Sequence, residues 1–279
     1  MATSKIWFVT GVSRGLGRAL AEALLARGDT VIGTTRSGAA DLAPGSGRLD
    51  VLALEQTDPA AVTRTVAAAF RLHGRIDVVV NNAGSGLLSS IEEASDADVE
   101  HVFAVNFHGP RRVIQAALGP LRAQRGGHIV NITSMAALSP NPGTGYYAAA
   151  KLAVEGMSQC LAREVAPLGI RVTLVEPSAF RTDFLSDRSI CRTATAIADY
   201  ASTVGASLAR LADMAGREPG DPARAAAAIL RAVESPDPPL HLVLGASAYA
   251  RARQMLDTFS AELEAWKPVA IGADFDPPR

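Results

Sequence analysis

A tyrosine and a lysine one helical turn apart are the residues of this chain best placed for chemistry. Tyr147 and Lys151 lie in the run GYYAAAK, and Ser134 precedes the tyrosine by thirteen positions. Side chains four residues apart share one face of a helix, where a cation can hold a phenol near its ionisation point. Only three of the 27 basic residues are lysines, so composition alone does not explain a lysine here. The pattern predicts an acid/base centre.

Two simpler readings of this motif stay open. The pair could be incidental on a surface helix, and the adjacent Tyr146 could compete for the role. Tyr146 stands five residues before Lys151, a spacing that turns the two side chains apart on a helix. We therefore expect Tyr146 to form wall or packing and Tyr147 to be the chemical group.

A glycine-rich turn occurs near the N-terminus, where residues 10–17 read TGVSRGLG. A predicted strand runs into it and a predicted helix follows it. Gly11, Gly15 and Gly17 permit a tight turn and let the backbone approach a pyrophosphate, whose charge the helix N-terminus stabilises. The turn predicts a dinucleotide site, and the alternative is a structural turn without a ligand.

The residues after the second predicted strand bear on the choice of cofactor. The sequence there is Thr34-Thr35-Arg36-Ser37, without an acid that would bind the ribose hydroxyls of NAD. Arg14 and Arg36 could clamp a 2′-phosphate from two sides, which favours NADP(H) over NAD(H). The alternative is that one arginine merely faces solvent.

Seven short apolar runs alternate with amphipathic helical stretches along the chain. The predicted strands are residues 6–10, 31–35, 51–54, 76–80, 128–133, 172–175 and 241–244. Strands joined by helical crossovers have to be parallel, with helices on both faces. The sequence therefore predicts an α/β fold, a doubly wound parallel seven-stranded Rossmann-type sheet, in a single domain over residues 1–279.

The segment 183–220 interrupts this alternation, because it carries a helical pattern but no predicted strand. Ligands of open α/β sheets bind outside the carboxyl ends of the strands, so an insertion after the sixth strand is placed to cover substrate. We expect residues 183–220 to form a substrate lid and residues 266–279 to form a C-terminal tail.

Bulk composition excludes several classes of partner. A net charge of −1 and a pI of about 6.5 leave no basic field for nucleic acid or anionic lipid. Cys160 and Cys191 fit no metal-ligand spacing, so we expect no metal, and isolated thiols favour a reducing compartment. The sequence shows no signal-peptide pattern and no stretch as long as a membrane span. We expect a cytoplasmic protein without nucleic-acid or membrane partners.

Four motifs in this order resemble the short-chain dehydrogenase/reductase family in its three-glycine form. They are the glycine turn at 10–17, Asn81-Asn-Ala-Gly84, Ser134, and Tyr147-x3-Lys151, and the resemblance covers residues 5 to 250. The longer C-terminal part and the phrase Val175-Glu-Pro177 are similar to a hydroxysteroid-dehydrogenase-like branch. The resemblance implies an NAD(P)-dependent carbonyl reductase or alcohol dehydrogenase.

The resemblance also implies catalytic roles. Tyr147 would be the general acid in reduction or the base in oxidation, with its pKa lowered from about 10 by Lys151 and an oxidised nicotinamide ring. Lys151 would also hold the nicotinamide ribose, and Ser134 would donate a hydrogen bond to the substrate oxygen. Asn106 matches the helix asparagine that positions a water for proton relay. Its alternative reading is a mid-helix asparagine whose side chain is satisfied by backbone.

Most of the family's cofactor contacts have counterparts in this sequence. They are Gly11, Ser13, Arg14, Gly15, Leu16, Gly17, Arg36, Glu55, Gln56, Asn82, Ala83, Gly84, Tyr147, Lys151, Pro177, Phe180 and Thr182. Two positions depart from the family pattern. Glu55-Gln56 stands where the family often has aspartate and an aliphatic residue, and Ser178 replaces a glycine beside the expected nicotinamide.

The residues expected to face substrate are apolar. They are Leu87, Leu88, Met135, Ala136, Leu138, Phe180, Phe184 and Leu185, whereas Arg181 and Arg188 are expected to be exposed loop residues. This favours NADPH-dependent reduction of a neutral, fairly bulky ketone. The alternatives are an NAD-dependent catabolic alcohol or hydroxysteroid dehydrogenase and a non-catalytic nucleotide-binding scaffold. Because members of the family often pair through the helix that carries the tyrosine, a homodimer or homotetramer is expected.

Overall fold

A sheet of seven parallel strands forms the centre of the computed structural model, which describes residues 4–186, 188–193 and 197–275. The strands are β1 (Ile6–Thr10), β2 (Thr30–Thr35), β3 (Arg48–Ala53), β4 (Val78–Asn81), β6 (Gly127–Ile132), β7 (Ile170–Pro177) and β9 (His241–Leu244). Their order is β3-β2-β1-β4-β6-β7-β9, and every neighbouring pair is parallel. The predicted α/β fold with seven parallel strands is confirmed.

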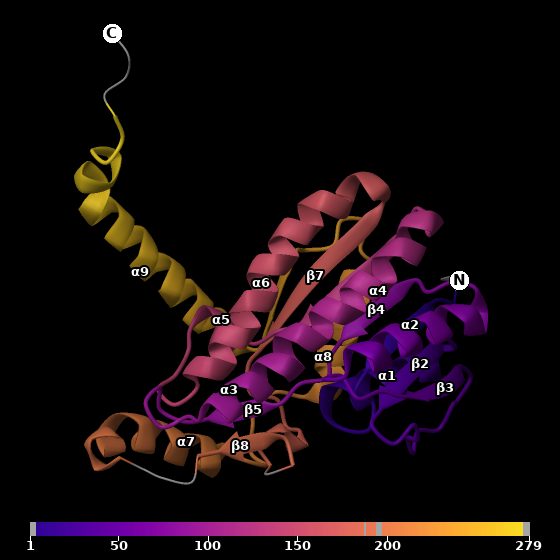
Figure 1. The fold of residues 1–279 in the computed structure, drawn as a ribbon, viewed down its shortest axis with the longest axis horizontal. Helices are drawn as coiled ribbons and strands as arrows, with labels where there is room; N and C mark the ends of the chain where they lie inside the picture. The colour runs from indigo at the N-terminus through magenta and orange to yellow at the C-terminus, as the bar shows by residue number, and fades with distance from the viewer. Residues whose placement is uncertain (1–3, 187, 194–196, 276–279) are drawn as a thin grey trace.

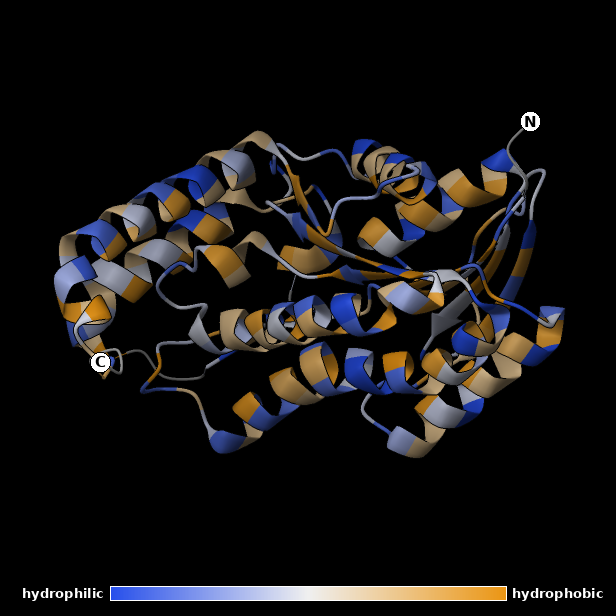
Figure 2. Cartoon of the chain, turned by 90° about the horizontal axis from the view of Figure 1, so that it is seen from above, coloured by the Kyte–Doolittle hydropathy of each residue, from blue (hydrophilic) through white to orange (hydrophobic). Residues whose placement is uncertain are grey.

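Helices cover both faces of this sheet (Figures 1 and 2). On one face, α1 (Gly15–Arg27) and α8 (Pro222–Glu234) pack against alternate strand residues such as Val9. On the other face, α2 (Pro59–His73), α4 (Gly109–Gln124) and α6 (Gly145–Val165) pack against their neighbours, such as Phe8. Because both faces are covered, the strands in the middle of the sheet are buried without alternation, as in β4, where Val78, Val79 and Val80 are all buried.

Helix ends follow the expected capping chemistry. Gly28 ends α1 in the left-handed region with φ 91°, and Asp58 and Asp221 accept hydrogen bonds from the first turns of α2 and α8. Ser95 and Asp98 form a capping box at α3 (Asp96–Phe103). These local contacts fix where the crossovers leave and rejoin the sheet.

The strand order reverses between β1 and β4, the two central strands. β1 continues outward to β2 and β3, whereas β4 continues outward to β6, β7 and β9. The connections that follow β1 and β4 therefore run in opposite directions, and a crevice opens between them at the carboxyl ends of the strands. The glycine turn, Asn82 and Ser134 follow strands at this edge, and Pro177 is the last residue of β7.

The segment 183–220 is mainly helical, but the prediction that it holds no strand was wrong. It contains η3 (Asp183–Leu185), β8 (Ile190–Arg192), η4 (Ala198–Tyr200), η5 (Ala201–Gly205) and α7 (Ala206–Met214). β8 pairs in parallel with β5 (Gly86–Leu88), and a Cβ added at Gly86 would lie 2.9 Å from Ile190 Cγ1. A three-residue strand depends on this distant partner, so local periodicity does not reveal it.

Helix α9 (Ala246–Ile271) follows the last strand and projects from the body (Figure 1). Its first turns contact α5 (Met135–Leu138) through buried Ala248 and Ala252. The expected tail from residue 266 is helical as far as Ile271, although Pro268 inside the helix has no backbone N–H to donate, and the helix ends at Gly272.

The remaining elements are η1 (Ala104–His108), a π-helical turn between α3 and α4, and η2 (Ala166–Leu168) after α6. Within the described ranges, none of the helices combines the length and the apolar character that crossing a bilayer requires.

Candidate active site

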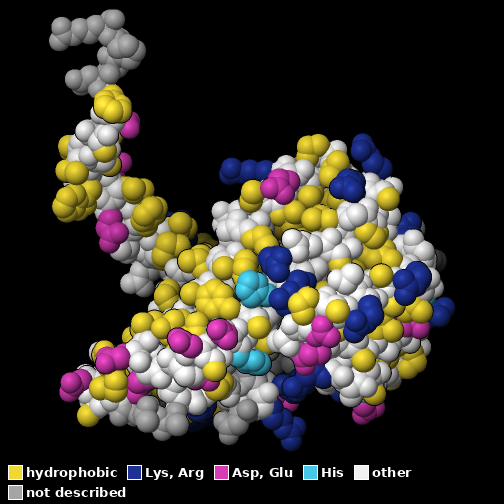
Figure 3. Space-filling view, in the orientation of Figure 1, with side chains coloured by type: hydrophobic (Ala, Val, Ile, Leu, Met, Phe, Trp, Pro, Cys, Tyr) yellow, Lys and Arg dark blue, Asp and Glu magenta, His cyan; other side chains and the backbone are white. Residues whose placement is uncertain are grey.

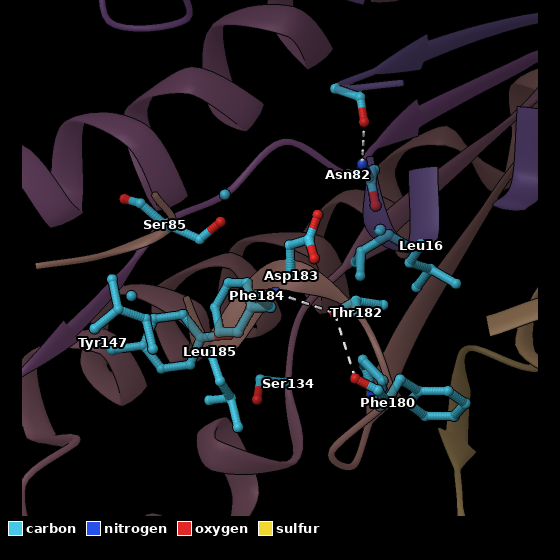
Figure 4. Close-up of a pocket in the computed structure, with 18 of the residues that line it drawn as sticks. Leu16, Asn82, Ser85, Ser134, Tyr147, Phe180, Thr182, Asp183, Phe184 and Leu185 are labelled. Atoms are coloured by element: carbon cyan, nitrogen blue, oxygen red, sulfur yellow. Dashed lines mark hydrogen bonds between the residues drawn. The ribbon is translucent and has the colours of Figure 1, made fainter. Parts of the chain in front are cut away.

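The carboxyl ends of the central strands surround a cavity of about 680 Å³. Ligand pockets commonly measure about 300 to 1,000 Å³, so the cavity is large enough for a sizeable small molecule. The loops after β1, β4, β6 and β7 form its walls, and residues 183–185 and 188–190 add a further wall (Figure 4).

The structure brings nearly all of the predicted site residues to this cavity. Two of the predicted residues, Gly17 and Asn106, lie behind the cavity wall. The residues that line the cavity are Gly11, Ser13, Arg14, Gly15, Leu16, Arg36, Glu55, Gln56, Asn82, Ala83, Gly84, Ser134, Tyr147, Lys151, Pro177, Phe180 and Thr182. Of the residues expected to face substrate, Leu87, Leu88, Met135, Ala136, Phe180, Phe184 and Leu185 also line the cavity. The prediction for Leu138 was wrong, because this side chain packs against the start of α9.

The glycine turn is held by a side chain from the neighbouring loop. Asn82 Nδ2 donates hydrogen bonds to the carbonyl oxygens of Thr10 (2.9 Å) and Gly11 (3.0 Å). A Cβ at Gly17 would overlap Asn82 Nδ2 and the Gly11 oxygen, so only glycine fits there. Gly11 and Gly15 have φ of 75° and 61°, the left-handed region that favours glycine.

The first turn of α1 is open to an anion. Arg14 occupies the N-cap position and makes no capping hydrogen bond with its side chain. The N–H groups at the start of a helix then lack an internal partner, and together with the helix dipole they favour negative charge. This arrangement fits the phosphates of the predicted dinucleotide.

Ser134, Tyr147 and Lys151 converge where β6 ends beside α6. Ser134 caps α5, its Oγ accepting a hydrogen bond from the Ala136 N–H at 3.1 Å, and its hydroxyl also interacts with that of Tyr147. Lys151 Nζ donates to the Ile132 carbonyl at 2.9 Å and lies 5.9 Å from the centroid of the Tyr147 ring. The Tyr147 ring also faces Phe184 of the 183–220 segment, with centroids 5.9 Å apart.

The neighbouring tyrosine points elsewhere, as expected. The Tyr146 hydroxyl donates a hydrogen bond to the Ile91 carbonyl at 2.9 Å, and Tyr146 is not part of the cavity wall. The assignment of Tyr147 rather than Tyr146 to the site therefore agrees with the geometry.

The protein environment does not lower the pKa of Tyr147. Burial raises the pKa to about 12, and the hydrogen bond with Ser134 opposes that rise. Burial also lowers the pKa of Lys151 to about 8, with the charge of Glu155 acting in the opposite direction. The expectation that Lys151 and a cationic nicotinamide together lower the tyrosine pKa stays a prediction.

Asn106 is fully buried in the π-helical turn η1. Its Nδ2 donates to the carbonyl oxygens of Ser85 (2.8 Å) and Val102 (2.9 Å), and its Oδ1 accepts from the Ser85 N–H (3.2 Å). Backbone therefore satisfies the side chain, as in the alternative reading. A Cβ at Gly84 would lie 2.9 Å from Asn106 Oδ1 and 3.4 Å from Lys151 Nζ, so both groups approach the same glycine.

The residues predicted to contact the adenosine part of the cofactor differ in exposure and in the hydrogen bonds that they make within the protein. Arg36 is exposed, whereas Arg14 Nη2 donates to the Arg188 carbonyl (3.2 Å) and to Ser189 Oγ (3.0 Å). Gln56 is buried, with Nε2 bonded to the Val105 carbonyl at 3.0 Å. Gln56 thus ties η1 to the loop after β3, which explains an amide at this unusual position.

Sequence reasoning missed several residues of the cavity wall. Leu211 and Met214 of α7, Glu218, and Ser247 and Arg251 of α9 all line it. The last two follow β9 at its carboxyl end, so the rule applied to the other strands would have pointed to them. Both predicted loop arginines are exposed; Arg188 lines the cavity, and Arg181 Nε donates to the Glu218 carbonyl at 3.3 Å.

A buried acidic pair lies next to Lys151. Glu155, one turn along α6, and Glu176 of β7 are both 0% exposed. A carboxylate oxygen of each glutamate and a ring nitrogen of His241 lie within 4.8 Å of one another. His241 Nδ1 is 2.6 Å from Glu176 Oε1, and Thr133 Oγ1 donates to Glu155 Oε1 at 2.7 Å. Burial raises the pKa of each glutamate to about 7, so the pair retains protons that exposed carboxyl groups would lose.

The chain is similar to proteins of known class along most of its length. Residues 5–190 match the family described as short chain dehydrogenase. Oxidoreductase BOA17 of Botryotinia fuckeliana is 37% identical over 274 residues, which are 97% of this chain and 99% of that protein. The 3-ketodihydrosphingosine reductase of Bacteroides thetaiotaomicron is 32% identical over 264 residues, 95% of this chain and 93% of that protein.

The fold also matches a solved structure closely. A short-chain dehydrogenase from Streptomyces avermitilis superposes with a TM-score of 0.90 at 38% sequence identity, covering 99% of this chain and 100% of that one.

Replacing Gly17 by alanine tests the junction of the two loops. Because the added Cβ overlaps Asn82 Nδ2 and the Gly11 oxygen, we expect Gly17→Ala to lower the free energy of unfolding by about 1 to 3 kcal/mol. Nucleotide binding should weaken as well. Denaturant unfolding and nucleotide titration measure the two effects. Gly156→Ala is the matched control, since a Cβ there meets nothing within 4 Å, and equal behaviour of the two variants would contradict the prediction.

Replacing Glu155 by glutamine tests the buried acidic pair. A carboxyl whose pKa is raised from 4.5 to about 7 in the folded chain stabilises it below the lower value and loses that contribution as pH rises to about 7. We therefore expect Glu155→Gln to be more stable than the natural chain above pH 7, with the difference fading towards pH 4.5.

Thermal unfolding between pH 5 and 9 provides the measurement, and Glu164→Gln, at an exposed position of the same helix, provides the control. A stability difference that did not change with pH would count against a proton held by Glu155.

Proposed function

The chain belongs to the short chain dehydrogenase family and is an NAD(P)-dependent oxidoreductase, and on this premise we propose that it reduces a neutral, fairly bulky ketone with NADPH. The observation that carries the proposal is the convergence of Ser134, Tyr147 and Lys151 in a cavity whose other wall is apolar.

The three side chains divide the work on the carbonyl group. A reduced nicotinamide, when bound, would supply the hydride that adds to the carbonyl carbon. Ser134 Oγ donates a hydrogen bond to the carbonyl oxygen and stabilises the negative charge that develops there. Tyr147 transfers its hydroxyl proton to that oxygen, so the product is the alcohol. Lys151, with a pKa of about 8, is suited to return a proton to the tyrosinate near neutral pH.

The protonation state of Tyr147 favours reduction over oxidation. A phenol whose pKa is about 12 carries its proton at neutral pH and is ready to act as an acid. Oxidation of an alcohol needs the tyrosinate, which the protein groups disfavour. The alternative, an NAD-dependent catabolic alcohol or hydroxysteroid dehydrogenase, would use the same three side chains in the opposite direction, with an oxidised nicotinamide lowering the tyrosine pKa. A non-catalytic scaffold would have no need of the three side chains together. We also propose that Asn106 takes part in relaying protons to Lys151, because both side chains approach Gly84.

The cofactor preference rests on charge at the end of β2. Arg36 is exposed on the cavity wall, and no acid stands between Thr34 and Ser37. A 2′-phosphate there would meet a guanidinium instead of a carboxylate. Arg14 can share in the contact through N–H groups not used on residues 188 and 189. We assign the predicted contacts of the glycine turn, Glu55, Gln56 and residues 82–84 to the same cofactor.

The substrate proposal rests on the apolar wall and on the segment 183–220. The cavity wall includes the apolar side chains of Leu87, Leu88, Phe184 and Leu185. These side chains favour a substrate with a hydrophobic part next to its carbonyl group. A relative named 3-ketodihydrosphingosine reductase is, by its name, a reductase of a keto compound. We propose that residues 183–220 act as the lid, while kinship with a hydroxysteroid-dehydrogenase-like branch names no substrate.

The free, exposed thiols of Cys160 and Cys191 suit the cytoplasmic location that we propose. We propose a homodimer or homotetramer paired through α6, because members of the family often pair through the helix that carries the tyrosine.

Substituting Tyr147 tests the chemistry directly. We expect Tyr147→Phe to lower kcat/KM with NADPH by about 100- to 10,000-fold on a panel of small, aromatic and steroid-sized ketones, because the proton donor is lost. Tyr146→Phe is the matched control and should stay within about threefold, since its hydroxyl bonds to Ile91. Nicotinamide absorbance reports turnover. Turnover that survives in Tyr147→Phe would exclude the assigned acid.

Substituting Arg36 tests the cofactor preference. We expect Arg36→Ala to reduce the ratio of kcat/KM with NADPH to that with NADH by about 10- to 100-fold, because a charge-assisted bond to the 2′-phosphate disappears. Arg18→Ala, which removes an arginine paired with Glu22 on α1, should leave the ratio unchanged. An unchanged ratio in Arg36→Ala as well would place the specificity elsewhere.

A further inference from the structure

Glu155 belongs to the same stripe of α6 as the tyrosine and the lysine of the site. Tyr147, Lys151 and Glu155 are spaced four residues apart, so their side chains share one face of the helix. Two neighbouring residues of β6 hold the last two of them. The Ile132 carbonyl accepts a hydrogen bond from Lys151 at 2.9 Å, and Thr133 Oγ1 donates one to Glu155 at 2.7 Å. Glu155 is thus fixed one turn from the lysine that would return a proton to the tyrosinate.

From Glu155, titratable groups lead to the surface of the protein. Glu155 Oε2 lies 4.0 Å from His241 Nδ1, and the same nitrogen lies 2.6 Å from Glu176 Oε1. Both glutamates are 0% exposed, unlike the acidic side chains that Figure 3 shows on the surface. The His241 side chain is 40% exposed. The three groups therefore connect the buried face of α6 to solvent.

The environment of the two glutamates favours a bound proton. Glu155 Oε2 and Glu176 Oε2 are buried and form no hydrogen bond within the described residues. Ionised oxygens in such a place stay unsatisfied, and two carboxylates this close repel each other. The charges that act on Glu155 come from Glu176, His241 and Lys151, and α5, which also packs on α6, has no charged residue. The pair therefore holds a proton that belongs to both carboxyl groups.

We propose that Glu155, Glu176 and His241 return protons from solvent to Lys151 after each reduction. This inference rests on the proposed function, because reduction of a ketone to an alcohol consumes one proton per turnover. The route differs from the one proposed for Asn106. Asn106 approaches Lys151 beside the loop after β4, whereas Glu176 and His241 stand on β7 and β9, on the other side of β6.

Each step of the route moves one proton. Lys151 gives a proton to the Tyr147 tyrosinate and becomes a neutral amine. The acidic pair gives its proton to that amine from Glu155 and regains one at Glu176 from His241 Nδ1. The proton then passes from Glu176 to Glu155, and the exposed imidazole takes another from solvent, as histidine does in other proton shuttles. One solvent proton therefore replaces the one that the alcohol product carries away.

Proton affinities along the route are close to one another. Burial lowers the pKa of Lys151 to about 8 and raises the pKa of each glutamate to about 7, so transfer from the acidic pair to the lysine amine is slightly downhill. A carboxyl group with the ordinary pKa of 4.5 would hold no proton to give at neutral pH. Side chains four residues apart on a helix have Cβ atoms about 5 to 6 Å apart, a gap that the flexible stem of a lysine can span.

Stopped-flow and steady-state kinetics with NADPH and a reducible ketone test the route. We expect His241→Ala to lower kcat by about tenfold or more, because the return of protons becomes slow. The rate of a single turnover, which uses protons already bound, should stay within about twofold of the natural chain. A burst of NADPH oxidation should therefore precede the slow phase, and KM should fall together with kcat.

Rescue by imidazole separates proton transfer from a structural role. Free imidazole should restore most of the kcat of His241→Ala, because it can bring protons to Glu176. Glu176→Gln should show the same loss without rescue, since its amide interrupts the route behind His241. His73→Ala is the matched control: it removes an imidazole bound to Asp50 at 2.8 Å outside the cavity wall, and kcat should not change with or without imidazole. Circular dichroism checks that all variants are folded.

Infrared spectroscopy examines the acidic pair without turnover. At pH 7 the natural chain should show the absorption of a protonated, buried carboxyl group. Glu155→Gln and Glu176→Gln should weaken this absorption, whereas Glu164→Gln, at an exposed position of α6, should leave it unchanged. A spectrum without the absorption would overturn the route.

The kinetic outcomes distinguish the route from the proposed function. Ketone turnover with an unchanged kcat in His241→Ala and Glu176→Gln would overturn the route and leave the function standing. A loss that also appears in the single turnover and resists imidazole would overturn it as well, because the role would be structural. So would a divalent ion found bound by the three side chains, whose donor atoms lie within 4.8 Å of one another. If the chain only oxidised alcohols, the proposed direction would fall, and His241→Ala should then slow the release of protons in the same way.

Discussion

The hydrogen bonds from the Asn82 side chain to the carbonyl oxygens of Thr10 and Gly11 hold together the two loops from which the cavity opens. The strands that carry these loops, β1 and β4, pair with each other only as far as Val9 and Val80, so the loops beyond them need a tie of their own. The amide supplies this tie, and Gly17 leaves the space that it needs. The open N-terminus of α1 and the groups after β4 consequently face the same cavity.

Desolvation sets the chemistry on the other side of the cavity. Lys151 is 5% exposed and keeps its ammonium group near the Ile132 carbonyl, yet burial brings its pKa to about 8. The negative charge that opposes this shift comes from Glu155, whose own pKa is raised by burial. The ionisation of Lys151 is thus linked to an acidic pair that extends through Glu176 to the exposed side chain of His241.

Much of the fold and most of the site could be predicted because local patterns specify them. Apolar runs bounded by caps gave all seven central strands, and residues after strand ends gave the cavity wall. Local patterns do not show which distant segment a strand pairs with, or how deeply the fold buries a side chain. The β5–β8 pair joins segments about a hundred residues apart, Leu138 is covered by a helix from the C-terminal part, and the pKa of Tyr147 depends on the burial that surrounds it.

The distance along the chain between the two ends of the Asn82 bond has a consequence for synthesis. The bond to Thr10 spans 72 residues. The glycine turn, although it stands at the start of the chain, cannot adopt its final form until residue 82 has left the ribosome and β4 has joined β1. An N-terminal fragment that ends before that residue would contain the whole glycine motif and still lack the geometry on which phosphate binding depends.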